Sequence, residues 1–417
     1  MAVRRLLIVN DALADLAGHY YEHDQAIREM HLPLGISTTI LANAKFTSDS
    51  EADRNIAPLF VRSWMRGDCR SSGRFSFALE LLKHNLYIYS VVAAYLKGQY
   101  FDCMFVPNAT IWDAFAYRAL LLTHKPKRFA RMVILLRFGM REFQDASAPV
   151  GRVRLLLWKI LLNSFSQAQR KGVACLATDS ARLAAEYEAA TGVRPVIFPC
   201  PKVVTVERAN PGSDPTRPYT FGCLGAARLE KGIDLLQTAA REMLAGHPEA
   251  NVRFLIQWIE DVRRLDGSLL KKDEMLLGDR RVVFVDRPLS SKEYQEHLQE
   301  IDCMVLPYRR EKYRSRISGV AVEAATSGIS VVYTSDTWLS DFLDSYGAGI
   351  AFDDGDVQSL TKAMWAMYRN RNRFNEEAAS KRHKALRENS PQRLMEGLWG
   401  YDPRNAESSA GVVARAF

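Results

Sequence analysis

Residues 303–332 read CMVLPYRREKYRSRISGVAVEAATSGISVV, and this stretch decides the fold. A short apolar run at residues 303–306 is followed by Pro307 and a basic loop. A helix of small apolar residues is then expected to begin at Ser318, because serine is a favoured N-cap residue. A second apolar run follows at residues 330–333. The order strand, helix, strand indicates a βαβ unit with parallel strands.

The same alternation runs through the whole chain and predicts an α/β fold made of two doubly wound, Rossmann-like units. A Pro- and Gly-rich break at residues 209–218 separates them. We therefore expect an N-terminal domain at residues 1–208, a C-terminal domain at 209–390, and a helix and tail at 391–417 that could pack back on the first domain. The expected strands are residues 6–10, 38–41, 103–106, 132–136, 173–177, 196–198, 219–224, 252–257, 282–285, 303–306, 330–333 and 349–352.

Length and composition favour a globular protein of two domains. The chain has 417 residues, of which 47% are hydrophobic and 25% charged. It has no apolar run of 18 residues that would suggest a spanning helix, and its first residues do not resemble a signal peptide. Its six cysteines form no CxxC pair, which favours reduced, buried thiols. We expect a soluble cytoplasmic protein.

The net charge of +8 favours anionic partners. Phosphorylated small molecules and an anionic membrane surface both fit. Nucleic acid ranks last, because the basic residues are dispersed and carry no nucleic-acid-binding motif. Residues 151–171, apolar in the middle and basic at both ends, could lie peripherally at the inner membrane face. A core helix with basic ends is the favoured alternative.

The start of the helix after Ser318 is a candidate anion site. Its first free N–H groups, at Gly319 and Val320, and the helix dipole both attract negative charge. Glu323 lies one turn further on the same face, where it could accept hydrogen bonds from ribose hydroxyls. The alternative is an ordinary exposed glutamate paired with a lysine or arginine.

A second candidate is the stretch FGCLGAARLEKGIDLL at residues 221–236. Gly225 turns the chain at the end of a strand, and Arg228 and Lys231 lie in the loop before the next helix. Two cations at the carboxyl end of a strand could bind a diphosphate. A solvated basic loop is the alternative.

Together these two stretches resemble the nucleotide-binding domain of glycosyltransferase family 4 (glycosyl transferases group 1), which has the GT-B fold. The resemblance implies a retaining glycosyltransferase that uses a nucleotide-diphosphate sugar, a glycan or lipid-linked acceptor, and no metal or other cofactor. It implies that Glu323 holds the ribose, and that Gly319, Val320, Arg228 and Lys231 hold the diphosphate. Bacterial polysaccharide or glycolipid synthesis would suit this class.

Two positions depart from the family. Ser315 stands where a second glutamate is usual, and Arg228 lies two residues beyond the usual arginine position. Ser315 keeps open a second reading, a catalytically inactive GT-B subunit that binds a glycan or a protein. A nicotinamide-dependent oxidoreductase is disfavoured, because no GxGxxG follows either leading strand.

The N-terminal half contributes weaker candidates. Gly18 and His19 resemble the family's turn into the first helix, which approaches the donor. His23 is expected to be a cap or a solvated histidine. Asn108 and Arg137 follow strands and are candidate acceptor contacts, although ordinary loop residues would give the same pattern.

Overall fold

The computed structural model describes residues 3–16, 19–69, 74–140, 151–201, 216–264 and 266–400. The chain divides into two compact units. Unit 1 comprises Met1–Pro201 with Ser390–Phe417, and unit 2 comprises Lys202–Asn389. Each is described by itself.

Unit 1 is built on a parallel sheet of seven strands in the order β3-β2-β1-β4-β5-β6-β7. The order reverses between β1 and β4. The chain leaving β1 therefore crosses one face of the sheet to β2, and the chain leaving β4 crosses the other face to β5. The strands are β1 (Arg5–Val9), β2 (Ser37–Asn43), β3 (Ile56–Phe60), β4 (Phe101–Ala109), β5 (Phe129–Leu136), β6 (Ala174–Thr178) and β7 (Val196–Ile197).

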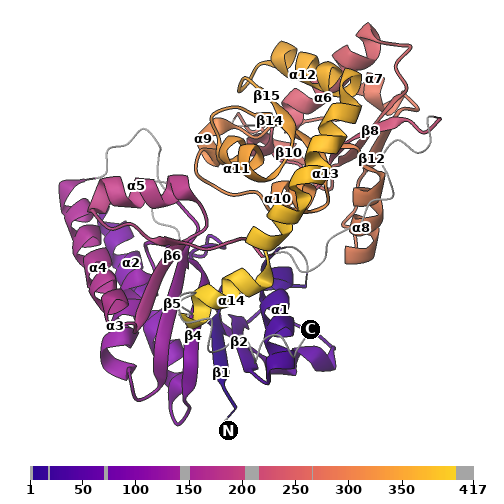
Figure 1. Ribbon diagram of the computed structural model, residues 1–417. Coiled ribbons are helices and arrows are strands. Elements are labelled where there is room, and N and C mark those ends of the chain that lie inside the picture. The colour runs from indigo at the N-terminus through magenta and orange to yellow at the C-terminus, as the bar shows by residue number, and fades with distance from the viewer. Residues whose placement is uncertain are drawn as a thin grey trace. The chain divides into compact units, whose positions relative to one another are not determined.

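Helices cover both faces of this sheet (Figure 1). One face packs against α2 (Arg74–Leu96), α3 (Ala114–His124), α4 (Arg152–Arg170) and α5 (Ala181–Thr191). The other packs against α1 (His19–His31) and α14 (Pro391–Trp399). Two 3-10 turns complete the unit: η1 (Leu32–Leu34) directly follows α1, and η2 (Glu51–Asn55) lies between β2 and β3. Helix α14 thus packs on unit 1 through its own Leu394 and Leu398, which are fully buried.

Unit 2 repeats the design with six parallel strands in the order β12-β9-β8-β13-β14-β15. Here the order reverses between β8 and β13. The strands are β8 (Tyr219–Cys223), β9 (Val252–Gln257), β12 (Val282–Val285), β13 (Cys303–Leu306), β14 (Ser330–Thr334) and β15 (Gly349–Phe352). A separate antiparallel hairpin joins β10 (Val262–Arg263) to β11 (Leu269–Leu270).

The helices of unit 2 follow its strands in alternation. They are η3 (Leu229–Lys231), α6 (Ile233–Gly246), α7 (Glu274–Leu277), α8 (Ser291–Glu300), α9 (Arg310–Tyr313), α10 (Gly319–Thr326), α11 (Trp338–Tyr346), α12 (Val357–Arg369) and α13 (Arg371–Glu388). The core contains the apolar strands β8 and β9 and the inner faces of α6 and α12.

The predicted α/β architecture is confirmed, including the strands at residues 252–257, 282–285, 303–306 and 349–352. The sequence did not predict β3 or the hairpin β10–β11. Most of the predicted linker, residues 209–215, lies outside the described residues. Five of the six cysteines are buried, and Cys200 is half-buried.

Candidate functional site

The two stretches singled out in the C-terminal half follow neighbouring strands. β8 and β13 pair directly, with Cys303 opposite Phe221 and Met304 opposite Gly222. The strand order reverses between them. Ligands of doubly wound sheets bind in the crevice at the carboxyl ends of such strands, because the flanking loops diverge there. The topology therefore places both loops at the binding edge of this sheet.

The loop after β8 is shaped by two glycines with positive φ. Gly225 has φ +95°, and its N–H donates to Oε1 of Gln257 at 2.7 Å. A Cβ at Gly225 would lie 3.0 Å from Nζ of Lys231, so the ammonium group is held close against the loop backbone. Gly232, with φ +69°, ends the 3-10 turn that carries Lys231.

Direct contacts join this loop to the one after β13. A Cβ at Gly232 would lie 1.8 Å from the carbonyl oxygen of Pro307, so only glycine allows the two backbones to approach this closely. The N–H of Arg309 donates to the carbonyl of Glu230 at 2.9 Å. The Arg309 guanidinium also bonds Asp234 at 2.5 Å, in the first turn of α6. The loop that carries Lys231 therefore lies directly against the segment that follows β13.

Helix α10 presents one partly accessible stripe at its start. Gly319, Val320 and Glu323 are half-buried, whereas the other residues of the helix are buried. Ser318 is the N-cap residue, and its Oγ accepts from the N–H of Ala321 at 3.3 Å. The first N–H groups of a helix have no intrahelical acceptor. The stripe therefore offers backbone donors at one end and a carboxylate one turn away.

Glu323 accepts a hydrogen bond from the hydroxyl of Tyr294, on α8. This partner was not foreseen, because Tyr294 lies 29 residues earlier in the chain. The bond holds one carboxylate oxygen in place. Glu323 is therefore neither fully exposed nor oriented only by its own helix.

Positive charge gathers around Lys231. Burial lowers the pKa of the Lys231 ammonium, and Arg228 and Arg316 lower it further, against the opposing effect of Cys223 and Glu230. Arg228 itself is exposed and lies 3.5 Å from Glu230. Arg316 was not among the predicted residues, although it lies only two positions before the N-cap. A cationic group held this close to other cations is suited to an anionic ligand.

Arg316 rests on a pair of buried tyrosines. Its guanidinium lies 5.4 Å from the ring centroid of Tyr313, which packs 4.2 Å from the ring of Tyr308. Ser318 donates from Oγ to the Tyr308 hydroxyl at 3.3 Å. The loop and the cap of α10 are thus joined through one buried aromatic pair.

The corresponding edge of the sheet in unit 1 carries a buried polar network. Asn10 follows β1 and donates to Asp24 at 2.6 Å, while Asn108 near the end of β4 donates to Asn10 at 3.2 Å. Arg137 follows β5 and lies 3.7 Å from Asp179, which follows β6. These strand ends include the switch point between β1 and β4, where the topology again favours a ligand.

His23 joins the two halves of this network. Its Nδ1 lies 3.1 Å from Asp24, and its Nε2 lies 2.9 Å from the guanidinium of Arg137. The histidine side chain is 8% exposed, so the expectation of a solvated or capping residue is wrong. Its burial is stabilised by Arg137, which lies 114 residues away in the chain. His19 is the first residue of α1, but its side chain and Gly18 lie outside the described residues.

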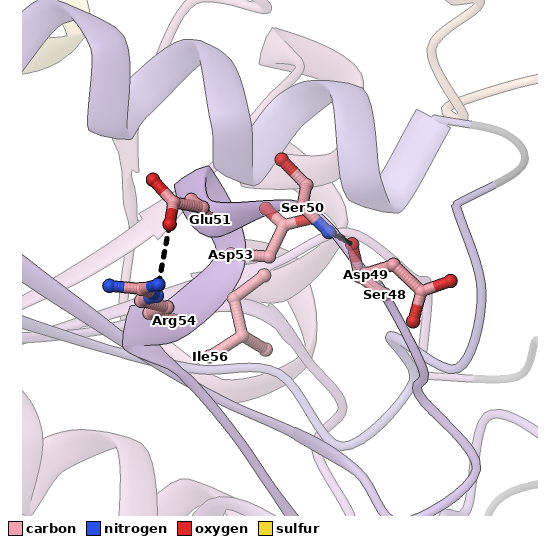
Figure 2. Close-up of a pocket in the computed structure, with 7 residues that line it drawn as sticks. All are labelled: Ser48, Asp49, Ser50, Glu51, Asp53, Arg54 and Ile56. Carbon is pink, nitrogen blue, oxygen red and sulfur yellow. Dashed lines mark hydrogen bonds and ion pairs between the residues drawn. The ribbon is translucent and has the colours of Figure 1, made fainter.

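A shallow pocket lies elsewhere in unit 1, and Figure 2 shows its lining. Asp53, which lines the pocket, already accepts hydrogen bonds from Ser48, Gln25 and Tyr21. Glu51 and Arg54, also in the lining, form an exposed ion pair. None of the predicted site residues lines this pocket. Several of its polar side chains form hydrogen bonds or ion pairs with each other. The lining comprises Ser48, Asp49, Ser50, Glu51, Asp53, Arg54 and Ile56.

Two absences apply to the part of the chain that the structure describes. No group of three or more His, Cys, Asp or Glu side chains is placed to hold a metal ion. No helix there is both long and apolar enough to cross a bilayer.

Comparison with known proteins gives one matching family model and several similar solved structures. Residues 218–370 match the family model "Glycosyl transferases group 1". No curated protein sequence matches the chain. Sucrose-phosphate synthase from Thermosynechococcus elongatus is similar in structure, with a TM-score of 0.67 and 14% identity over 98% of this chain and 100% of the other.

Two further solved structures resemble the chain. WaaG, a glycosyltransferase involved in lipopolysaccharide biosynthesis, has a TM-score of 0.60 and 13% identity, over 95% of this chain and all of the other. HepE from Anabaena, solved with UDP-glucose, has a TM-score of 0.56 and 11% identity, over 98% of this chain and all of the other. Residues 218–370 thus match the glycosyl transferases group 1 family model, and the chain has the GT-B fold of these solved structures.

Proposed function

We propose that this protein transfers a sugar from a nucleotide-diphosphate sugar to a glycan or lipid-linked acceptor, with net retention at the anomeric carbon. The diphosphate would bind the N–H groups of Gly319 and Val320 together with Lys231 and Arg228. Glu323 would accept hydrogen bonds from the ribose hydroxyls. The UDP and UDP-glucose complexes of HepE make uridine nucleotides the first donors to test.

The observation that carries this proposal is the junction of the two loops. Gly232 against Pro307, and Arg309 N–H to Glu230, hold the cationic turn beside the segment that leads into α10. A diphosphate carries its charge on oxygens only a few ångströms apart, so donors from two loops can bind it together only if the loops are adjacent. The junction supports the proposal because it makes them adjacent.

The same groups suggest how the reaction proceeds. The bond between the anomeric carbon and the diphosphate oxygen breaks, and the acceptor oxygen forms its bond on the same face of the sugar. The acceptor proton passes to the departing diphosphate. Lys231 and the helix N–H groups would stabilise the negative charge that develops on the leaving group. Cationic side chains in this role are the basis for proposing that no metal is needed.

Calorimetric titration of UDP, GDP and ADP, followed by product stereochemistry by NMR with the preferred donor sugar, tests the proposal. We expect one nucleotide to bind and the product to keep the anomeric configuration of the donor. Lys231→Ala should lose turnover while the protein remains folded. Absence of binding to all three nucleotides would favour the inactive subunit, the reading that Ser315 keeps open.

A further inference from the structure

Exposed leucine and isoleucine side chains gather on the outer helices of unit 1. On α2, Leu79, Leu82 and Leu86 are 43%, 57% and 57% exposed. On α4, Leu156, Leu157 and Ile160 are 56%, 49% and 59% exposed. We call these six side chains the leucine surface. Single exposed apolar residues are ordinary, but a cluster on neighbouring helices marks an interaction site.

The two parts of the leucine surface lie at the same end of the unit. α2 and α4 both connect parallel strands. They therefore run antiparallel to those strands, and each begins near the carboxyl ends of the strands. α3 packs between them. The guanidinium of Arg154, in the first turn of α4, lies 5.1 Å from the ring of Phe77 in the first turn of α2 and 5.5 Å from the ring of Trp112. The N-terminal turns of the two helices are thus joined.

Charge on these helices is strongly one-sided. Helices α2, α3 and α4 contain seven Lys and Arg residues and one acidic residue, Glu80. Glu80 is paired with Arg62 at 2.8 Å and with Lys83 at 3.1 Å. Helix α4 contains no acidic residue, and its Arg152 and Lys159 are exposed beside the leucines. The chain as a whole, by contrast, has 56 basic and 48 acidic residues.

We propose that the leucine surface docks on an anionic lipid bilayer. Leucine and isoleucine would enter the headgroup–acyl boundary, while Arg152 and Lys159 reach the lipid phosphates with their aliphatic stems along the apolar face. An anionic lipid surface attracts basic side chains and repels acidic ones, so the excess of Lys and Arg on these helices favours this partner. Contact would be peripheral. It would hold the carboxyl edge of the sheet, with Asn10, Asn108 and Arg137, close to the membrane where a lipid-linked acceptor would lie.

Vesicle flotation of the full chain tests this proposal. The vesicles are phosphatidylcholine alone or with phosphatidylglycerol. We expect the protein to float with the anionic vesicles, and less so at high salt. L156Q/I160Q and L82Q/L86Q should each weaken binding on the order of ten-fold. K159Q should weaken it about five-fold, and only at low salt.

The control is L277Q, because Leu277 on α7 of unit 2 is also 57% exposed but lies outside the leucine surface. L277Q should bind vesicles like the wild type. Thermal unfolding would show that every variant is folded. The proposal is overturned if the wild type floats with neither vesicle, or if the double variants bind like L277Q. It is also overturned if sedimentation shows a dimer that the double variants dissociate and no vesicle binding. Because no donor is present, the outcome is independent of nucleotide binding.

Discussion

The guanidinium of Arg137 donates a hydrogen bond to Nε2 of His23 at 2.9 Å. A guanidinium can only donate, so Nε2 must be the acceptor and the proton of the neutral imidazole must lie on Nδ1. There it faces the carboxylate of Asp24 at 3.1 Å. One contact between residues far apart in the sequence thus fixes both the tautomer and the orientation of the histidine.

Replacing Arg137 should destabilise unit 1, because the change leaves His23 and the buried Asp179 without this cation. We expect Arg137→Met to lower the free energy of unfolding by about 2–4 kcal/mol. The matched control is Arg54→Met, since Arg54 is 75% exposed in its ion pair with Glu51 and should change stability by less than about 0.5 kcal/mol. Urea unfolding measures both, and equal effects would contradict the role given to Arg137.

Gly232→Ala tests the junction of the two loops. The new Cβ would lie 1.8 Å from the Pro307 carbonyl, so the loops must separate. We expect loss of nucleotide binding and destabilisation of about 2–4 kcal/mol. Gly35→Ala is the control, because Gly35 has the same φ of +69° but open space around its Cα. It should cost only about 1 kcal/mol, the strain of the left-handed conformation.

Lys231→Met tests whether Lys231 contributes to nucleotide binding or to the stability of the folded protein. The ammonium is held among other cations in a site shaped for an anion, so its removal should not lower the melting temperature of the ligand-free protein. Nucleotide affinity should fall about 10- to 100-fold, the value of a charge-assisted hydrogen bond. Lys312→Met, which removes a half-exposed lysine paired with Glu311, should leave affinity unchanged. A large loss of stability in Lys231→Met would show that the lysine is structural.

The pH dependence of Lys231→Met has a defined sign. Because the folded-state pKa of Lys231 is lowered, the unfolded chain holds the proton over a pH range where the folded chain has lost it. The stability of the wild type relative to Lys231→Met should therefore rise with pH across that range. Nucleotide affinity of the wild type should fall over the same range, because the diphosphate prefers the charged lysine. Calorimetry and urea unfolding across the alkaline range measure the two trends.

Glu323→Gln tests the ribose contact. The amide keeps the shape of the side chain but replaces one acceptor oxygen by a donor group, so discrimination between a ribonucleotide and its 2′,3′-dideoxy analogue should shrink. Tyr294→Phe removes the hydroxyl that orients the carboxylate and should weaken ribonucleotide binding by a smaller factor, about two- to ten-fold. Competition calorimetry with the two nucleotides measures this. If Glu323→Gln discriminates between the two nucleotides as well as the wild type does, the ribose does not contact Glu323.

Much of the fold could be predicted because buried parallel strands are continuous apolar runs. β13, which reads CMVL, has this character, and its predicted bounds are those observed. β3 was missed because IAPLF contains a proline and lies at the sheet edge, where Pro58 and Leu59 are exposed. The hairpin β10–β11 was missed because each strand has only two residues.

The site was predictable where it depends on local chain geometry. Gly225, Gly232 and Ser318 lie beside the groups that they position, so spacing alone locates them. The partners of Glu323 and His23 come from distant segments, Tyr294 and Arg137, and only the folded chain brings them together. Burial of His23 is a tertiary effect that no local pattern in HYYEHD indicates.

Asp11 gives a separate prediction, on stability against pH. It follows Asn10 at the carboxyl edge of unit 1. Burial, followed by repulsion from Asp113, raises the pKa of its carboxyl from 3.8 to about 7. Asp113 itself bonds His84 at 2.6 Å, and the pKa of His84 is raised to about 10, so this histidine stays charged at neutral pH.

Between pH 4 and 7 the folded chain holds the Asp11 proton and the unfolded chain does not, so this carboxyl contributes stability at low pH that is lost as the pH rises through 7. Asp11→Asn removes the titration. The stability of the wild type relative to this variant should therefore fall by a few kcal/mol from pH 4 to pH 8, at about 1.4 kcal/mol per pKa unit. Asp49→Asn, at an exposed position of the same unit, is the control and should show little pH dependence relative to the wild type. Urea unfolding at pH 5, 6, 7 and 8 measures the trend. A wild type that gains stability over Asp11→Asn as the pH rises would show that the folded chain stabilises the charged carboxylate and lowers its pKa.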